Sequence, residues 1–404
     1  MLGVKTAALP ASLRRTNQRT VISLLLQLGS ASRADLAKAA GISQPTAGKI
    51  TTELLDLGIL RETEFPEEPS DSQSSPRLGR PGQLLCLEDR HPRFLAIELG
   101  VAETSVSALP VAVKLQDEWT CNFPTSHSPE AWIKGLKEVT AKLNVQKLWG
   151  VLISVPGIVD EAAGKILFSP NLHWLETTDL TELVKRAWNL PVLLVQEIRA
   201  LALGHLAAEP TEEDFLLIDF SQGVGGAIVF EGKLYAHRMP ISGEIGHTPV
   251  PGNLRPCGCG AVGCLETLVS ERGLLESFSA TQKESPNWQT LVQHVKEHGI
   301  EPWLAETLEA TAKVVAGALN ALGIQRVIVT GRITELPNSV EQLAAEIKEG
   351  ALWGRFGDVA CASAPHRRAA GLVASGIDRL ILPADEPHLA WPKRQRRNKK
   401  LEAI

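Results

Sequence analysis

Three cysteines within a few residues of one another, with a histidine shortly upstream, form a compact group of potential metal ligands. The cysteines lie in the stretch CGCGAVGC and the histidine in GEIGHTPV. The four residues are His247, Cys257, Cys259 and Cys264. One imidazole and three thiolates satisfy a tetrahedral zinc ion and leave no ligand position open for water, which is typical of a structural site. The sequence therefore predicts structural zinc here, and a group of idle thiols is the alternative.

The N-terminal part of the chain has the pattern of a helix-turn-helix. A leucine-rich apolar face predicts a first helix that begins near Asn17 and stops at Gly29. Ser32 and Ser43 are expected to cap two further helices, with Gly41 in the turn between them. Short helix, glycine turn and second helix together are typical of DNA-binding units.

The third predicted helix has one apolar and one polar face. Its core side is expected to hold Ile50, Leu54 and Leu57. Its other face carries polar side chains of the types that reach base edges and phosphates in a major groove. The predicted DNA contacts of the two capped helices are Arg33, Gln44, Thr46 and Lys49. A small helical bundle that only packs on the rest of the chain is the alternative.

After Leu60, two β-prone arms enclose a segment rich in Pro, Ser and Glu. This pattern predicts the wing of a winged helix, in which Arg80 of GRPG enters a minor groove and Arg77 assists. A plain linker is the alternative. We expect the DNA-binding domain, wing included, to span residues 1–88.

Charge is divided unevenly along the chain. Residues 1–62 hold eight basic and four acidic side chains, a net +4, and the remaining 33 basic and 42 acidic residues give −9. This division favours contact of a polyanion with the N-terminal part alone. Residues 386–404 form a basic tail that we expect to be disordered, either as a solvated end or as an aid to DNA attraction.

From about residue 93 the chain alternates apolar runs with amphipathic helical stretches, which favours an α/β architecture. Strands are predicted at residues 93–100, 148–157, 192–197, 214–220, 225–235 and 326–331. Helices are predicted at residues 131–143, 180–188, 305–322 and 341–350. No signal peptide or segment of about 18 uninterrupted apolar residues is found, so we expect a cytoplasmic protein without a membrane partner.

Four motifs occur in a characteristic order behind the predicted helix-turn-helix and GRPG. They are SVPGIVD, FSPNLHW, GEIGHTPV and CGCGAVGCLE. In this the chain resembles the ROK family of bacterial sugar-responsive repressors and sugar kinases, and more closely its repressor branch. The resemblance implies a two-lobed, actin-like or hexokinase-like domain over residues 89–385 with a hexose cleft. It also implies a homodimer or homotetramer that binds an operator in double-stranded DNA and represses genes of carbohydrate uptake and catabolism.

The resemblance also implies residues that bind the effector, a sugar or a sugar derivative such as a sugar phosphate. Glu244, His247 and Glu266 match family positions that hydrogen-bond sugar hydroxyls, although Glu266 could instead cap the helix that follows it. Gln196 and Glu197 stand where phosphorylating members have an Asn-Asp pair whose aspartate is the general base. Glu197 is therefore a degenerate base position.

The predicted nucleotide loops depart from the kinase pattern at three places. Glu98 begins ELGVAET in place of an Asp-x-Gly-x-Thr turn, Ser221 begins SQGVGGA in place of a Gly-Thr-Gly loop, and Arg332 replaces a glycine. The glycines of the second loop could cradle phosphate or permit tight packing at a hinge. We expect a regulator rather than an enzyme, and a sugar kinase with an added DNA-binding domain is the alternative.

Overall fold

The fold is described from a computed structural model. It covers residues 10–64, 83–113, 119–143, 145, 147–235, 241–282 and 286–382. Arg77, Arg80, the middle of the predicted wing and the basic tail at 386–404 lie outside the described residues.

Three helices and a small antiparallel sheet form the N-terminal part, which we call the head. Its elements are α1 (Pro10–Leu28), β1 (Ser30–Ser32), α2 (Arg33–Ala39), α3 (Gln44–Asp56), β2 (Leu60–Thr63) and β3 (Leu84–Leu87), with sheet order β1-β3-β2. The hydroxyl of Ser32 accepts from the Asp35 amide at 3.2 Å, and that of Ser43 accepts from the Thr46 amide at 3.3 Å. Both predicted caps thus begin their helices, and the arms β2 and β3 pair as expected of a winged helix.

Two details of the head differ from the sequence prediction. The first helix begins at Pro10, not near Asn17, because tertiary contacts extend it: Arg14 pairs with Glu53 of α3 at 2.8 Å. Leu57 is 38% exposed, because α3 ends at Asp56 and the chain turns at Gly58, which places Ile59 and Leu60 in the core instead.

The first lobe of the body is built on a mixed sheet of order β10-β7-β4-β5-β6. Its strands are β4 (Phe94–Leu99), β5 (Glu103–Leu109), β6 (Thr120–Pro124), β7 (Gly150–Val155) and β10 (Val192–Gln196). A hairpin of β8 (Ile158–Asp160) and β9 (Lys165–Phe168) projects from it, and its helices are α4 (Pro129–Thr140), α5 (Trp174–Thr177) and α6 (Leu180–Trp188). β10, β7 and β4 run parallel and are almost fully buried, as expected of strands covered on both faces.

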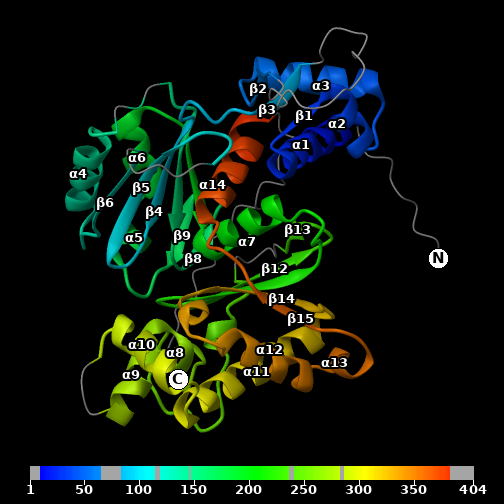
Figure 1. Cartoon of the computed structure of the whole chain (residues 1–404). Coiled ribbons are helices and arrows are strands. Elements are labelled where there is room, and N and C mark those ends of the chain that lie inside the picture. Colours follow the sequence, from blue (N-terminus) through cyan, green and yellow to red (C-terminus); the bar gives the residue numbers. More distant parts are fainter. Residues whose placement is uncertain are drawn as a thin grey trace, which may run out of the picture.

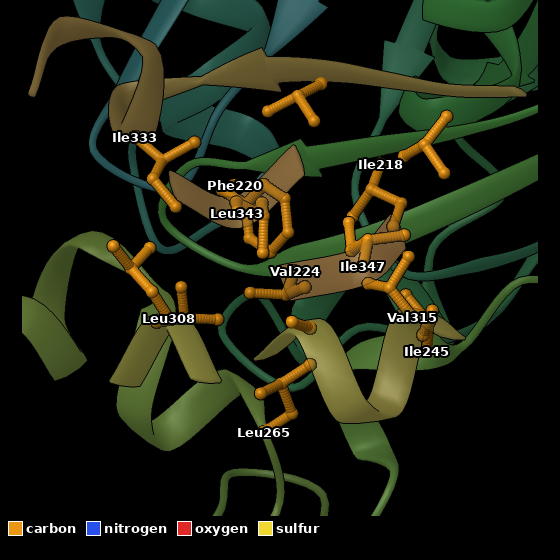
Figure 2. Packing of buried hydrophobic residues seen from close by; sticks show 14 of the residues in the cluster. Ile218, Phe220, Val224, Ile245, Leu265, Leu308, Val315, Ile333, Leu343 and Ile347 are labelled. Carbon is orange, nitrogen blue, oxygen red and sulfur yellow. The ribbon is translucent and has the colours of Figure 1, made fainter. Parts of the chain in front are cut away.

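The second lobe is built on a sheet of order β13-β12-β11-β14-β15. Its strands are β11 (Phe215–Phe220), β12 (Val224–Phe230), β13 (Lys233–Leu234), β14 (Arg326–Gly331) and β15 (Ala360–Ser363). Its helices are α8 (Glu266–Val269), α9 (Glu271–Gln282), α10 (Trp288–His298), α11 (Pro302–Leu322), α12 (Ser339–Gly350) and α13 (Trp353–Phe356), with short turns η2 (Ile245–His247) and η3 (Arg332–Glu335). Figure 2 shows how Ile218 and Phe220 of the sheet meet Val315, Leu343 and Ile347 of the helices in one buried cluster.

Two helices lie between the head and the lobes. They are α7 (Glu197–Ala208) and α14 (Arg368–Gly376), and α14 continues into the π-helical turn η4 (Ile377–Ile381). A Cβ atom at Gly371 of α14 would lie 1.7 Å from the carbonyl oxygen of Ala200 in α7, so the two backbones touch. Figure 1 shows α14 running up to the head, with the second lobe below.

The head and the first lobe share one hydrophobic cluster. It joins Val21 and Leu25 of α1 to Phe94 of β4 and to Ile377 of η4. The predicted fold class, a winged helix-turn-helix followed by a two-lobed α/β body, is confirmed. Within the described residues, no helix is both long enough and apolar enough to cross a bilayer.

Candidate functional site

The loops after β13 bring the predicted metal ligands together. The ligand atoms of His247, Cys257, Cys259 and Cys264 all lie within 4.8 Å of one another. His247 comes from the turn η2, while the cysteines follow in a loop whose Gly260 and Gly263 adopt positive φ angles of 90° and 86°. These glycines let the loop fold back on itself, because side chains disfavour that backbone conformation.

The distances within this group fit a four-coordinate metal ion. The Cys259 and Cys264 sulfurs are 3.7 Å apart, and the Cys257 sulfur lies 3.6 Å from Nδ1 of His247. A tetrahedron with metal–sulfur bonds of about 2.3 Å and metal–nitrogen bonds of about 2.0 Å has edges of roughly 3.8 and 3.5 Å. Burial and the neighbouring thiols raise the pKa of Cys264 to about 12, so a cation is needed to hold all three sulfurs as thiolates. The group could therefore hold a metal ion.

Beside the metal ligands lie the predicted sugar-binding carboxylates. Nε2 of His247 is 3.8 Å from Glu244, and the side chain of Gln196 lies beside the same carboxylate, where it acts to lower the pKa of Glu244. Burial raises the pKa of Glu244, and His247 acts in the opposite direction. Glu266 accepts from the backbone amide of Val224 at 2.9 Å. Its carboxylate is thus tied to the start of β12 and does not cap α8.

Glu197 belongs to an ion-pair cluster that the sequence did not reveal. Arg368, the first residue of α14, has its guanidinium 3.6 Å from Glu197 and 3.3 Å from Glu98 of β4. Burial raises the pKa of Glu197, and Arg368 opposes that rise. Asp219 lies nearby, accepting from Thr330 at 2.8 Å and lying 3.7 Å from His366, whose pKa is lowered by burial and by Arg368.

A cavity of about 720 Å³ opens between the two lobes next to Glu266. Asn171, which follows β9 in the first lobe, lines one side, and Gln222 and Glu271 line the other. Asn171 lies in the motif FSPNLHW, so its sequence context was the signal that could have placed it in the site. Polar groups that converge on a hollow of this size are typical of small-molecule sites.

The glycine loop at β12 is explained by packing. A Cβ atom at Gly226 would lie 2.8 Å from the carbonyl oxygen of Gly243, and one at Gly223 would lie 3.0 Å from Glu266. Arg332, which the sequence resemblance places where kinases are expected to have a glycine, pairs with Glu271 at 3.3 Å and lies over the Trp288 ring at 5.5 Å. Its side chain thus fills space in that loop.

The head presents the predicted DNA contacts on α3 and beside it. Gln44 and Lys49 are exposed on α3, while Thr46 is half-buried with its hydroxyl 2.8 Å from that of Ser43. Arg33 of α2 pairs with Glu62 of β2 at 3.2 Å, so contact with a phosphate would require it to leave that partner.

The sequence is similar to that of known repressors and sugar kinases. Residues 94–374 match the ROK family. The xylose repressor of Caldicellulosiruptor bescii is 26% identical over 334 residues, covering 77% of this chain and 81% of the repressor. The N-acetylmannosamine kinase of Salmonella newport is 26% identical over 286 residues, covering 70% of this chain and 97% of the kinase.

Among solved structures, a ROK family transcriptional regulator described as a homolog of the E. coli MLC protein superposes with a TM-score of 0.70 at 20% identity. The superposition covers 91% of this chain and 97% of the regulator, so it includes the head as well as the two lobes. The family match extends over more than half of the chain. The chain therefore belongs to the ROK family.

Proposed function

We propose that this protein is a DNA-binding transcriptional repressor that responds to a sugar. The observation that carries this proposal is the head, in which the capped helix α3 exposes Gln44 and Lys49. A helix of this kind in a winged helix-turn-helix enters the major groove and reads base edges. The similarity to the xylose repressor supports the same function. Because the proposed partner is double-stranded DNA, we place the protein in the cytoplasm.

In this proposal residues 1–88 bind DNA and residues 89–385 form the effector domain. The proposed ligands of the sugar hydroxyls are Gln196, Glu197, Glu244, His247 and Glu266. Burial raises the pKa of Glu197 and of Glu244, while Arg368 and His247 favour the ionised carboxylates, which accept hydrogen bonds from paired hydroxyls.

The four ligands beside the cleft are proposed to hold one structural zinc ion. A His and three Cys satisfy the ligand preference of zinc and leave no coordination position for a substrate water. The ion would fix the ring of His247 through Nδ1 and so direct Nε2 toward Glu244, as the present distances of these two nitrogens suggest.

The operator arrangement follows from symmetry. Two heads on a homodimer, or pairs of heads on a homotetramer, would meet half-sites about one helical turn apart. A cleft ligand that changes the relative pose of the heads would mismatch them to these half-sites and change the affinity for DNA.

Duplex binding by the intact chain tests the proposal. We expect Lys49→Ala to weaken binding to a fluorescent duplex from the region upstream of its own gene, because it removes one phosphate contact per head. Fluorescence anisotropy at several salt concentrations should show a loss of about one unit of the salt slope for each contact removed.

Lys137→Ala is the matched control, since Lys137 is likewise an exposed lysine, on α4 of the first lobe. Equal affinities of the Lys49 variant, the Lys137 variant and the unmodified protein would contradict the assignment of α3.

A sugar kinase is the second candidate. The similarity to an N-acetylmannosamine kinase and the carboxylate of Glu197 near the position of the general base favour it. The pairing of that carboxylate with Arg368 at 3.6 Å argues against it, because the carboxylate would have to leave this partner to accept a proton from a sugar hydroxyl. Turnover of ATP with a hexose that disappears in Glu197→Ala would favour the kinase.

A further inference from the structure

Arg368 lies among the carboxylates of Glu98, Glu197 and Asp219, beside the proposed effector site. Its side chain is 13% exposed and lies 3.3 Å from Glu98 and 3.6 Å from Glu197, so a single guanidinium joins the end of β4 to the start of α7. Its Nε atom is buried and has no hydrogen-bond partner among the described residues. The present pairing therefore leaves part of the guanidinium unsatisfied, and a buried donor without a partner lowers the stability of this arrangement.

Arg368 also begins a continuous helical rod. Gly376 and Ile377 at the junction of α14 and η4 both have right-handed helical dihedrals, so the backbone continues unbroken from Arg368 to Ile381. Ten residues separate Arg368 from Asp378, which corresponds to about 15 Å along a helix. A displacement of the backbone at Arg368 along the rod axis would carry Asp378 with it, because the hydrogen bonds of one continuous helix join the two positions.

The far end of the rod holds the DNA-binding head. The Asp378 carboxylate accepts from Nε of Arg19 at 2.6 Å and from Nε of Arg15 at 3.2 Å, both on α1. Arg15 also donates to the backbone carbonyl of Asp378. The Arg15 side chain is only 8% exposed, so its ion pair is shielded from solvent and constrains α1 more than a surface pair would.

A second contact returns from the same end of the rod to the cleft. Arg379 donates to the Glu161 carboxylate at 3.0 Å and to the Glu161 carbonyl at 3.0 Å. The Glu161 carboxylate in turn accepts from the backbone amide of Gln196 at 3.1 Å. The end of the rod is therefore tied to the head on one side and to the residue before Glu197 on the other.

We propose that Arg368 is a positioning residue of the effector site, and that the rod it begins couples the pairing of Glu197 in the cleft to the position of α1 in the head. This inference rests on the proposed function of the cleft. A ligand hydroxyl that donates to Glu197 competes with Arg368 for the same carboxylate oxygens. The ligand then shifts the rod because it stabilises the arrangement in which Arg368 has left Glu197.

Hydrogen–deuterium exchange on the intact protein tests the coupling without any ligand. Arg368→Gln removes the charge at the cleft end, and we expect amide exchange in α1 to rise by about tenfold, the usual scale of coupling between sites. Arg368→Lys keeps the charge and should restore slow exchange in part. Arg367→Gln is the matched control, because the neighbouring Arg367 pairs outside the cleft with Glu209 at 3.4 Å.

The reciprocal variant keeps the test decisive if Arg368→Gln does not fold. Asp378→Asn weakens the head end of the rod, and we expect faster exchange both in α1 and at the start of α7, where Glu197 lies. Exchange in α1 that stays at the unmodified level in folded Arg368→Gln, or faster exchange confined to α1 in Asp378→Asn, would overturn the coupling. Failure of the proposed function would be recognised separately, because the unmodified protein would then bind no duplex at all.

Discussion

The two ring nitrogens of His247 face different neighbours, and this residue joins the metal ligands to the cleft. Nδ1 lies 3.6 Å from the Cys257 sulfur and Nε2 lies 3.8 Å from the Glu244 carboxylate. A metal bound at Nδ1 fixes the ring and leaves the Nε2 hydrogen for the cleft. Loss of the proposed ion would therefore disturb both the loop around the cysteines and the carboxylates that we propose as sugar ligands.

Substitution of one thiol tests the zinc site. Cys264 is buried, and Cys264→Ser should lower the zinc content of the purified protein from about one ion per chain to near zero and should lower its melting temperature, since metal binding contributes directly to folding. Elemental analysis and thermal unfolding measure the two effects.

Cys121→Ser, at a half-buried cysteine of β6 outside the group, is the control and should keep the zinc. Absence of zinc from the freshly reduced, folded unmodified protein would contradict the assignment.

Among single residues, the sequence predicted the site residues that lie close together along the chain. It missed the ones that only the fold brings together. His247 and the cysteines share one short segment with a recognisable spacing, so their proximity in space was predictable. Arg368 and Glu98 are 270 positions apart, and no local pattern connects them. Only the packing of α14 against α7 brings the guanidinium to Glu197.

At the scale of elements, α7 and α14 approach each other closely, and glycine makes this approach possible. A Cβ atom at Gly371 would lie 1.7 Å from the Ala200 carbonyl oxygen, and one at Gly204 would lie 2.0 Å from that of Arg367. The obstacle in each case is backbone, which cannot rotate away as a side chain can. The two helices can therefore pack backbone against backbone because these positions carry no side chains.

A matched pair of glycine substitutions tests this contact. We expect Gly371→Ala to lower the free energy of unfolding by about 1–3 kcal/mol or more, because the helices must separate to admit a methyl group. Gly317→Ala should instead raise it by up to about 1 kcal/mol, since that position in α11 has no atom within 4 Å of an added Cβ and alanine favours helix. Urea denaturation measures both, and equal effects of the two substitutions would contradict the account.

Element prediction succeeded where periodicity and caps were local. The helix expected at residues 180–188 is α6 (Leu180–Trp188), and Ser32 and Ser43 cap α2 and α3 as expected. The short strand β1 was not predicted, because three residues carry no periodicity and it exists only through its pairing with β3. The helix α14 was not predicted either, because its sequence contains two glycines and its two faces are buried only by packing against α7 and the first lobe.

For the whole molecule, the head is not a free appendage of the body. Its α1 contributes Val21 and Leu25 to a buried cluster shared with the first lobe, and its Arg15 and Arg19 are held by Asp378. A change between the lobes therefore reaches the head through packed contacts rather than through a flexible linker. Such an arrangement suits a body that controls the pose of a DNA-binding unit.

The claim that the body controls DNA binding by the head is tested most directly by the affinity of the intact protein for a duplex from its own upstream region. The affinity is measured in the presence of ATP and of each monosaccharide and its phosphate in turn. ADP is assayed in the same samples. The account predicts that at least one sugar or sugar phosphate changes the duplex affinity by about tenfold or more, without sugar-dependent ADP formation. ADP formation with a sugar, while no sugar or phosphate alters duplex binding, would contradict it.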